Sequence, residues 1–211
     1  MNSLAEDFKQ AITSIDRLKA KDIIRKVCDE DNALECIEQI MIPALENMGQ
    51  EWEQGKIALA QVYMGSRICE EIVEKMLPRA VSHQHNAARM AITVLEDQHQ
   101  LGKRIVYSVL KASGFDIQDY GTTTVDTLIP KIRTDEIKIM LISTLMLSSA
   151  LKIKTLISQL REKGLQTRII VGGAPFRFDE DLWTEVQADA MGKTASDATI
   201  IVKRFVAEVK S

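Results

Sequence analysis

Three short groups of polar and small residues could carry chemistry in this chain. They are DQHQLG at residues 97–102, STL at residues 143–145 and GGA at residues 172–174. His99 could ligate a metal ion, and Asp97 could accept the proton on its other ring nitrogen, which fixes the tautomer and raises ligand basicity. A glycine pair lets a bulky ligand approach the backbone closely. The three groups therefore predict a metal-ligating histidine beside space for a bulky ligand.

Each group directly follows a short apolar run that reads as a β-strand. After residue 86, strands and helices alternate about five times, which is typical of an α/β fold with a doubly wound, flavodoxin-like, five-stranded parallel sheet. The strands are expected at residues 90–95, near 117, and at 137–142, 167–171 and 188–191. The helices are expected at residues 101–112, 128–133, 150–163, 182–186 and 195–209. Because such sheets bind ligands at the carboxyl ends of their strands, the three groups should converge on one edge.

The first part of the chain predicts helices only. Apolar residues recur at helical spacing within residues 4–15, from residue 22, within 33–48 and within 59–77, which indicates a four-helix bundle. Pro43 lies inside the third pattern and can kink that helix. Residues 78–89 lack periodicity and read as a linker. We therefore expect an all-α domain at residues 1–85 and a Rossmann-like α/β domain at residues 86–211.

Length and composition exclude several classes of protein. The chain has 211 residues, of which 45% are hydrophobic and 27% charged, and its formal net charge is −3. This balance argues against a nucleic-acid binder, which needs clustered Lys and Arg to neutralise phosphates. No apolar run is long enough to span a bilayer, and the N-terminus lacks the apolar core of a secretory signal. We expect a cytoplasmic protein that binds neither nucleic acid nor a membrane.

The cysteines Cys28, Cys36 and Cys69 show no CxxC spacing, and all three lie in stretches that read as helix. We expect them to be small buried hydrophobic residues in a reducing compartment. His83 and His85 lie in the linker, where we expect no metal-binding role.

A resemblance to a known family rests on the order and separation of the motifs. DxHxxG, SxL and GG, each after a strand, resemble the cobalamin-binding domain shared by cobalamin-dependent methionine synthase, the mutases and the corrinoid proteins of methyltransferase systems. The segment IPALENMGQEWEQGK at residues 42–56, continued by LAQV at 59–62, is similar to the helical cap of methionine synthase and of small corrinoid proteins. Together the matches cover nearly the whole chain. The DxHxxG motif alone would be weak evidence for this family, whereas the ordered set of motifs is specific for it.

The resemblance implies a role for each matching residue. His99 matches the lower axial cobalt ligand, Asp97 its hydrogen-bond partner, and Ser149 the third member of that ligand's proton relay. The residues that match the pocket of the cofactor's nucleotide tail are Gly102, Ser143, Leu145, Gly172 and Gly173. The residues that match the apolar cover of the upper corrin face, in the helical cap domain, are Trp52, Leu59 and Val62.

The function implied by the resemblance is that of a methyl carrier. The cofactor would be cobalamin or a related corrinoid, with methylcobalamin in the loaded state. A substrate-specific methyltransferase would load the methyl group, and a second methyltransferase would pass it to a thiol or a folate-like acceptor. A corrinoid-reactivating protein is a further expected partner. The chain itself offers no catalytic residue and would be a non-catalytic subunit. An alternative is a cobalamin sensor or storage protein that acts through protein contacts.

The sequence departs from the family pattern at two places in the first motif and one in the cap. Glu96 stands where the common methyltransferase pattern has Gly, and Gln100-Leu101 replaces Asp-Ile. Trp52 stands where methionine synthase has Phe. These departures leave the partner and the upper ligand open.

Other interpretations of the same residues also remain open. His99 could be an ordinary loop residue, and the serines at 143, 148 and 149 could cap the following helix. The glycine pair could form a plain turn. Trp52, Leu59 and Val62 could belong to the core of the bundle.

Overall fold

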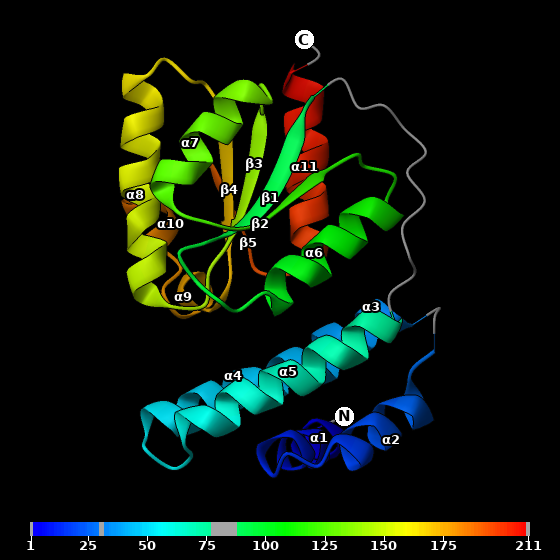
Figure 1. The fold of residues 1–211 in the computed structure, drawn as a ribbon. Helices are drawn as coiled ribbons and strands as arrows, with labels where there is room; N and C mark the ends of the chain where they lie inside the picture. The colour runs from blue at the N-terminus through cyan, green and yellow to red at the C-terminus, as the bar shows by residue number, and fades with distance from the viewer. Residues whose placement is uncertain (1, 30–31, 77–87, 210–211) are drawn as a thin grey trace. The chain divides into compact units, whose positions relative to one another are not determined.

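The computed structural model describes residues 2–29, 32–76 and 88–209 (Figure 1). Its internal contacts divide the chain into two compact units, Met1–Arg79 and Ala80–Ser211. Most of the predicted linker, with His83, His85 and the predicted boundary between residues 85 and 86, lies outside the described residues.

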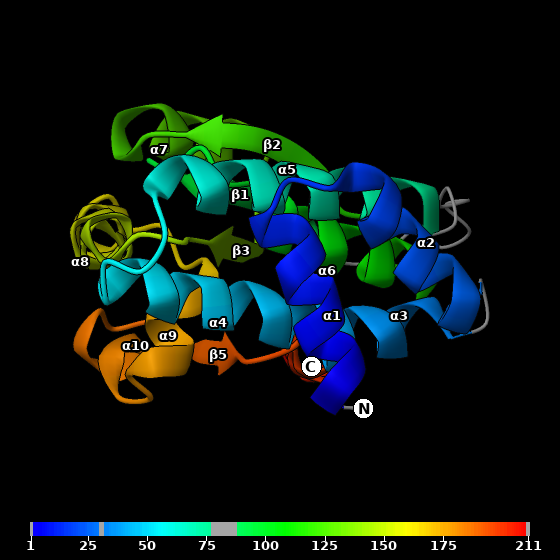
Figure 2. The ribbon, with the colours of Figure 1, turned by 90° about the horizontal axis from the view of Figure 1, so that it is seen from below.

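The first unit is helical, as the apolar spacing predicted. Its elements are α1 (Asn2–Thr13), α2 (Arg17–Val27), α3 (Ala33–Cys36), a π-helical segment η1 (Ile37–Met41), α4 (Ile42–Glu53) and α5 (Leu59–Met76). Because α3, η1 and α4 follow one another without a break, they form one continuous helix. The described part of this unit therefore has four helices, counted as α1, α2, α3–α4 and α5. Helix α1 packs across α4 and α5 (Figure 2).

Two local signals explain where these helices begin and change. Helix α2 begins at Arg17, five residues earlier than predicted, because the Asp16 side chain accepts the Lys19 N–H at 3.0 Å and caps its first turn. The irregularity expected at Pro43 lies in η1, where the Ile42 N–H bonds five residues back to the Ile37 carbonyl. A single π turn next to a proline, which has no N–H to donate, keeps the helix from α3 to α4 continuous.

Buried apolar side chains from α1, η1, α4 and α5 form the centre of this unit. Phe8, Ile12, Met41, Met48 and Ile68 are at most 1% exposed. No helix in the described ranges is both long and apolar enough to cross a bilayer.

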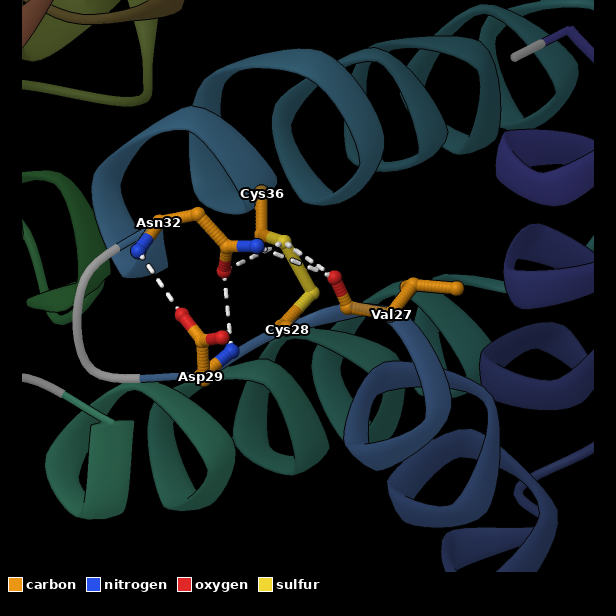
Figure 3. Close-up of a disulfide and its surroundings, with 5 residues drawn as sticks. All are labelled: Val27, Cys28, Asp29, Asn32 and Cys36. Atoms are coloured by element: carbon orange, nitrogen blue, oxygen red, sulfur yellow. Dashed lines mark hydrogen bonds between the residues drawn. A yellow bond between two sulfur atoms is a disulfide. The ribbon is translucent and has the colours of Figure 1, made fainter.

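The cysteine prediction was wrong for two of the three residues. Cys28 and Cys36 form a disulfide (Figure 3). The chain reverses between the end of α2 and the start of α3, which brings their Cα atoms to 6.1 Å, within the range that a disulfide needs. Cys69 in α5 is a buried free thiol, as predicted.

The second unit is an α/β fold with the predicted parallel sheet. Its strands are β1 (Met90–Leu95), β2 (Gln118–Thr123), β3 (Ile139–Ser143), β4 (Arg168–Gly172) and β5 (Ala190–Gly192), in the order β2-β1-β3-β4-β5. Its helices are α6 (Leu101–Ala112), α7 (Val125–Thr134), α8 (Leu147–Glu162), α9 (Ala174–Phe178), α10 (Leu182–Glu185) and α11 (Ala195–Val209). Helices α7 and α8 cover one face of the sheet, and α6 and α11 cover the other (Figure 1).

Strand β2 and helix α9 differ most from the prediction, while α7 and α8 each begin three residues earlier than expected. Strand β2 begins later than expected and runs to Thr123, because its polar sequence QDYGTT lies at an edge and shows no apolar alternation. It contains a register shift against β1 and a left-handed residue, Gly121 at φ +68°. Helix α9 was not predicted, since its five residues are too few to show helical periodicity.

The strand register aligns the three motifs at one edge. Val94 of β1 pairs with Ser143 of β3, and Ser143 in turn pairs with Gly172 of β4. Gly173 then adopts φ +116°, and a Cβ built there would lie 1.8 Å from the Thr144 carbonyl oxygen. The loop after β4 therefore passes against the backbone of the loop after β3.

We expect Gly173→Ala to lower the free energy of unfolding by about 3 kcal/mol or more, because the Thr144 backbone cannot move away. Gly164→Ala is the matched control, since Gly164 is also left-handed but a Cβ added there would have no atom within 4 Å. Gly164→Ala should lower the free energy of unfolding by only about 1 kcal/mol. Urea unfolding of both variants measures the difference, and equal losses would contradict the close approach at Gly173.

Candidate functional site

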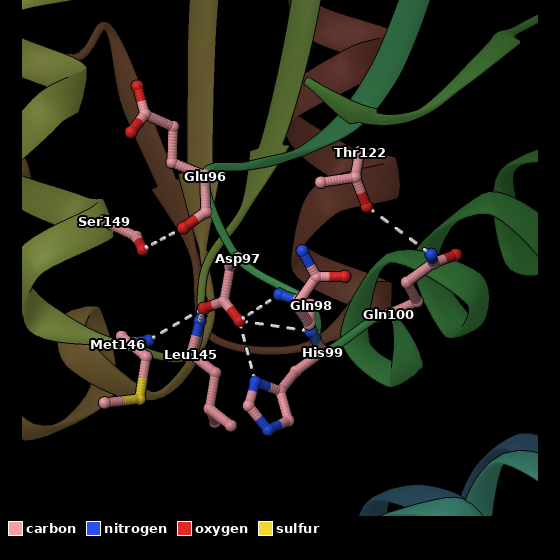
Figure 4. A network of polar contacts seen from close by, with 9 residues as sticks. All are labelled: Glu96, Asp97, Gln98, His99, Gln100, Thr122, Leu145, Met146 and Ser149. Atoms are coloured by element: carbon pink, nitrogen blue, oxygen red, sulfur yellow. Dashed lines mark hydrogen bonds and ion pairs between the residues drawn. The ribbon is translucent and has the colours of Figure 1, made fainter. Parts of the chain in front are cut away.

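The loop after β1 places His99 beside a buried carboxylate. The Asp97 side chain is 1% exposed and the His99 side chain 26% exposed. His99 Nδ1 lies 2.7 Å from Asp97 Oδ1, and the other ring nitrogen points away from Asp97 (Figure 4). The structure thus brings together the aspartate and the histidine that the first motif predicted.

Backbone N–H groups of two loops also bond to the Asp97 carboxylate. Oδ1 accepts the N–H groups of Gln98 and His99 at 2.7 and 3.1 Å. Oδ2 accepts those of Leu145 and Met146 at 2.8 and 3.0 Å. Asp97 therefore joins the loop after β1 to the loop after β3.

These bonds determine the charge of Asp97 and the tautomer of His99. Burial raises the pKa of the Asp97 carboxyl, but the bonds from the His99 ring and from the N–H groups of Leu145, His99 and Met146 outweigh it. The pKa of Asp97 is held well below its usual range. An ionised carboxylate only accepts, so His99 Nδ1 carries the proton. In the neutral ring, Nε2 is then the nitrogen with the lone pair.

The Ser149 hydroxyl bonds to the main chain next to Asp97, and its role in a proton relay stays a prediction. The hydroxyl donates to the Glu96 carbonyl at 2.8 Å, and five donors already surround Asp97. Ser149 is 3% exposed and holds the residue before Asp97 in place. Helix α8 has Met146 at its N-cap and no side-chain cap bond, so the serines do not cap it.

Glu96, the departure from the family pattern, has a left-handed backbone at φ +49°. This conformation explains why glycine suits the position. The Glu96 carboxylate forms an ion pair with Lys152 of α8 and accepts the Val125 N–H at the start of α7 at 3.4 Å. The hydrogen bond from Lys152 lowers the pKa of Glu96 despite partial burial. Sequence reasoning could not find this role, because a glutamate gives no sign of a left-handed backbone.

The small residues of the three motifs meet beside this loop. A Cβ on Gly102 would lie 3.0 Å from Ser143 Oγ, and one on Gly172 would lie 3.0 Å from the Gly192 carbonyl oxygen. Side chains at these positions would crowd the contact of α6 with the end of β3 and the contact of β4 with β5. The glycine pair is therefore more than a plain turn, since both members stand in close approaches. Leu145 is 36% exposed.

Lys103, which directly follows the first motif, is a second position that sequence reasoning missed. It is 2% exposed, and its ammonium lies 2.6 and 2.7 Å from the two carboxylate oxygens of Asp119 on β2. A buried lysine needs such a partner. The pair ties the start of α6, and hence the loop that carries His99, to β2.

The predicted cap residues belong to the helical unit. Trp52 lies in α4 and Val62 in α5, both partly buried, and Leu59 begins α5 at 56% exposure. Leu59 is therefore not part of the bundle core. The role of these residues over a corrin face stays a prediction.

Among the residues that the structure describes, no three His, Cys, Asp or Glu side chains form a group that could hold a metal ion.

Comparisons with known proteins find matches for both units of the chain. A family profile described as a B12 binding domain matches residues 89–201, more than half of the chain, and a second of that description matches residues 4–76. The trimethylamine corrinoid protein of Methanosarcina barkeri is 28% identical over 204 residues, which cover 92% of this chain and 93% of the relative. The dimethylamine corrinoid protein of the same organism is 26% identical, with coverage of 97% and 98%.

Solved structures share the fold. The monomethylamine corrinoid protein of Methanosarcina barkeri matches with a TM-score of 0.79 at 23% identity, covering 95% of this chain and 97% of that chain. The methanol:cobalamin methyltransferase complex of the same organism contains a chain that matches with a TM-score of 0.54 at 18% identity, with coverage of 98% and 81%.

Asp97→Asn should destabilise even the protein without ligand. Either orientation of the amide turns its NH₂ group toward at least two backbone N–H donors, which leaves them unsatisfied. We expect the free energy of unfolding to fall by about 3 kcal/mol. The control is Asp126→Asn, an exposed aspartate of α7, which should change it by less than about 0.5 kcal/mol. Equal losses of stability in urea unfolding would show that the hydrogen bonds to the Asp97 carboxylate do not hold the two loops together.

Two replacements of Glu96 distinguish the contribution of its side-chain bonds to stability from that of its left-handed backbone. Glu96→Ala loses the bonds to Lys152 and Val125 but keeps a Cβ at φ +49°, so stability should fall by about 1 kcal/mol. Glu96→Gly also loses those bonds but removes the backbone strain, and it should be about 1 kcal/mol more stable than the alanine variant. Urea unfolding compares the two, and a glycine variant no more stable than alanine would show an unstrained backbone.

Proposed function

Because the chain belongs to the family of B12 binding domain proteins, we propose that it carries a methyl group on a bound cobalamin or related corrinoid between two methyltransferases. The observation that carries the proposal is the buried Asp97 carboxylate, which holds the His99 ring with Nε2 directed away from it. A neutral imidazole nitrogen is a good ligand for a transition metal. The family match identifies the metal as cobalt.

The residues at the sheet edge fit this cofactor. A corrin ring brings four nitrogen ligands of its own, so the protein needs to supply only one. The glycines at 102, 172 and 173 let the loops at this edge approach one another closely, and Ser143 Oγ, beside Gly102, offers a hydrogen-bonding group to the tail of the cofactor. When bound, cobalamin supplies the cobalt ion that takes up and releases the methyl group.

Each residue then has a distinct task. His99 would hold the cobalt of the cofactor through Nε2, and Asp97 would keep Nδ1 protonated and the ring in position. Ser149 and Glu96 hold the turn that carries Asp97. Gly102, Ser143, Leu145, Gly172 and Gly173 accommodate the nucleotide tail of the cofactor. No residue of the chain is assigned a catalytic step.

The helical unit has the complementary role in this proposal. Residues 1–85 form a cap domain, whose Trp52, Leu59 and Val62 cover the upper corrin face and exclude water from the methyl group. Residues 86–211 hold the cofactor. A partner enzyme has to reach that face to exchange the methyl group.

The partners follow from the reaction and from the relatives. The relatives are named for trimethylamine and dimethylamine, and a chain of the same fold occurs in a complex with a methanol:cobalamin methyltransferase. We propose a substrate:corrinoid methyltransferase as the donor enzyme and a second methyltransferase, acting on a thiol or folate-like acceptor, as the receiving enzyme. A corrinoid-reactivating protein would maintain the cofactor, and the exchange would take place in the cytoplasm.

The protein should bind one cobalamin with the nucleotide tail displaced from cobalt by His99. Electron paramagnetic resonance of the protein loaded with hydroxocobalamin and reduced to Co(II) should show coupling to one histidine nitrogen, labelled with ¹⁵N. His99→Ala should abolish this coupling, whereas the control variant His85→Ala should keep it. Coupling to the benzimidazole nitrogen in the wild type would contradict the assignment of His99.

Carrier and sensor functions differ in a second measurement on the same loaded protein. A carrier, reduced and offered a methyl donor with a corrinoid methyltransferase, should gain and then pass on one methyl group per cofactor. Cobalamin binding without methyl uptake from any such enzyme would favour a sensor or storage protein instead.

A further inference from the structure

The disulfide of the helical unit joins two elements at a reversal of the chain. Cys28 is the residue after α2, and Cys36 ends α3, eight positions later (Figure 3). We propose that this pair is a reversible thiol–disulfide site, opened by a dithiol reductant, and that the corner between α2 and α3 is native in both states. The proposal is independent of the cofactor and of the methyl-carrier function.

The surroundings of Cys36 suit a thiol as well as a disulfide. Its sulfur lies 3.8 Å from the Val27 carbonyl oxygen and 3.6 Å from Asn32 Oδ1. A disulfide sulfur has no hydrogen and cannot donate to these oxygens, whereas a thiol is a weak donor. After reduction the two sulfur atoms move apart, and the buried Cys36 thiol then has two hydrogen-bond acceptors close by.

The corner also has bonds that do not depend on the sulfur atoms. The Asp29 N–H donates to Asn32 Oδ1 at 2.8 Å, and the Asn32 N–H donates to Asp29 Oδ1 at 3.1 Å. The Asn32 amide also donates to the Val27 carbonyl at 3.2 Å. These bonds keep the two cysteines close after reduction, so that the disulfide can form again.

The two sulfur atoms differ in access, which sets the order of exchange. Cys36 is 6% exposed, whereas Cys28 is only partly buried. A thiolate of the reductant attacks the Cys28 sulfur and forms a mixed disulfide, and the electron pair of the broken bond leaves on Cys36, which takes up a proton. The second thiol of the reductant then attacks the mixed disulfide and releases Cys28. The reductant ends as a disulfide, and the pair gains two electrons and two protons.

The third cysteine does not compete in this exchange. Cys69 is 0% exposed, and burial raises the pKa of its thiol well above the usual range. Only a thiolate attacks a disulfide, so Cys69 stays inert. In reducing compartments, the disulfides that do occur are mostly transient or redox-sensing, which agrees with a pair of this kind.

The test uses the full-length protein without cofactor, equilibrated with oxidised or reduced dithiothreitol and then alkylated. Mass spectrometry after denaturing alkylation should find one label, on Cys69, in the oxidised form and three in the reduced form, and reoxidation should restore one. The far-ultraviolet circular dichroism should be the same in both forms. The thermal midpoint should fall by about 10 °C on reduction, as expected for loss of a short cross-link.

Two variants make the test specific. Cys69→Ser should keep the shift in thermal midpoint, and Cys28→Ser should lose it and melt like the reduced wild type. Three labels in the oxidised protein would overturn the proposal, because no disulfide would then form. Loss of helix on reduction would also overturn it, because the bond would then be a structural requirement rather than a reversible site.

Discussion

The arrangement of the sheet edge depends on one buried carboxylate. Asp97 is almost inaccessible to water, and a charge in such a place is tolerated only when hydrogen bonds replace its hydration. Five donors from two separate loops provide that replacement. The loops after β1 and β3 are therefore stable together in the one conformation that directs their N–H groups at this residue. The orientation of the His99 ring follows from the same requirement.

Residues outside the motifs keep the carboxylate at its place. Glu96 accepts a strained backbone and is held by α7 and α8, while the bond from Ser149 fixes its carbonyl. On the other side, the Lys103 and Asp119 pair holds the start of α6 against β2. The histidine thus stands on a loop whose two ends are both anchored to regular structure, which is what a well-oriented metal ligand requires.

Sequence reasoning predicted the parts of the fold that depend on periodicity. The strand–helix alternation, the sheet and the meeting of the three motifs all follow from apolar patterns and from the direction of parallel strands. It missed what depends on backbone geometry or on contacts between distant residues. Three such features do not show in the apolar spacing of the sequence. They are the left-handed turn at Glu96, the bond from Ser149 to a main-chain carbonyl and the disulfide between Cys28 and Cys36. Strand β2 was shifted because an edge strand with a polar sequence does not alternate.

The two edge strands of the sheet, β2 and β5, affect how readily the protein aggregates at high concentration. An open edge strand offers unpaired N–H and C=O groups to a second molecule, and a long, flat edge promotes aggregation. Here β2 is polar, contains a left-handed glycine and shifts its register, while β5 has only three residues. Neither edge is a good template for intermolecular pairing. The same irregularity that displaced β2 from its predicted position protects the molecule from edge-to-edge association.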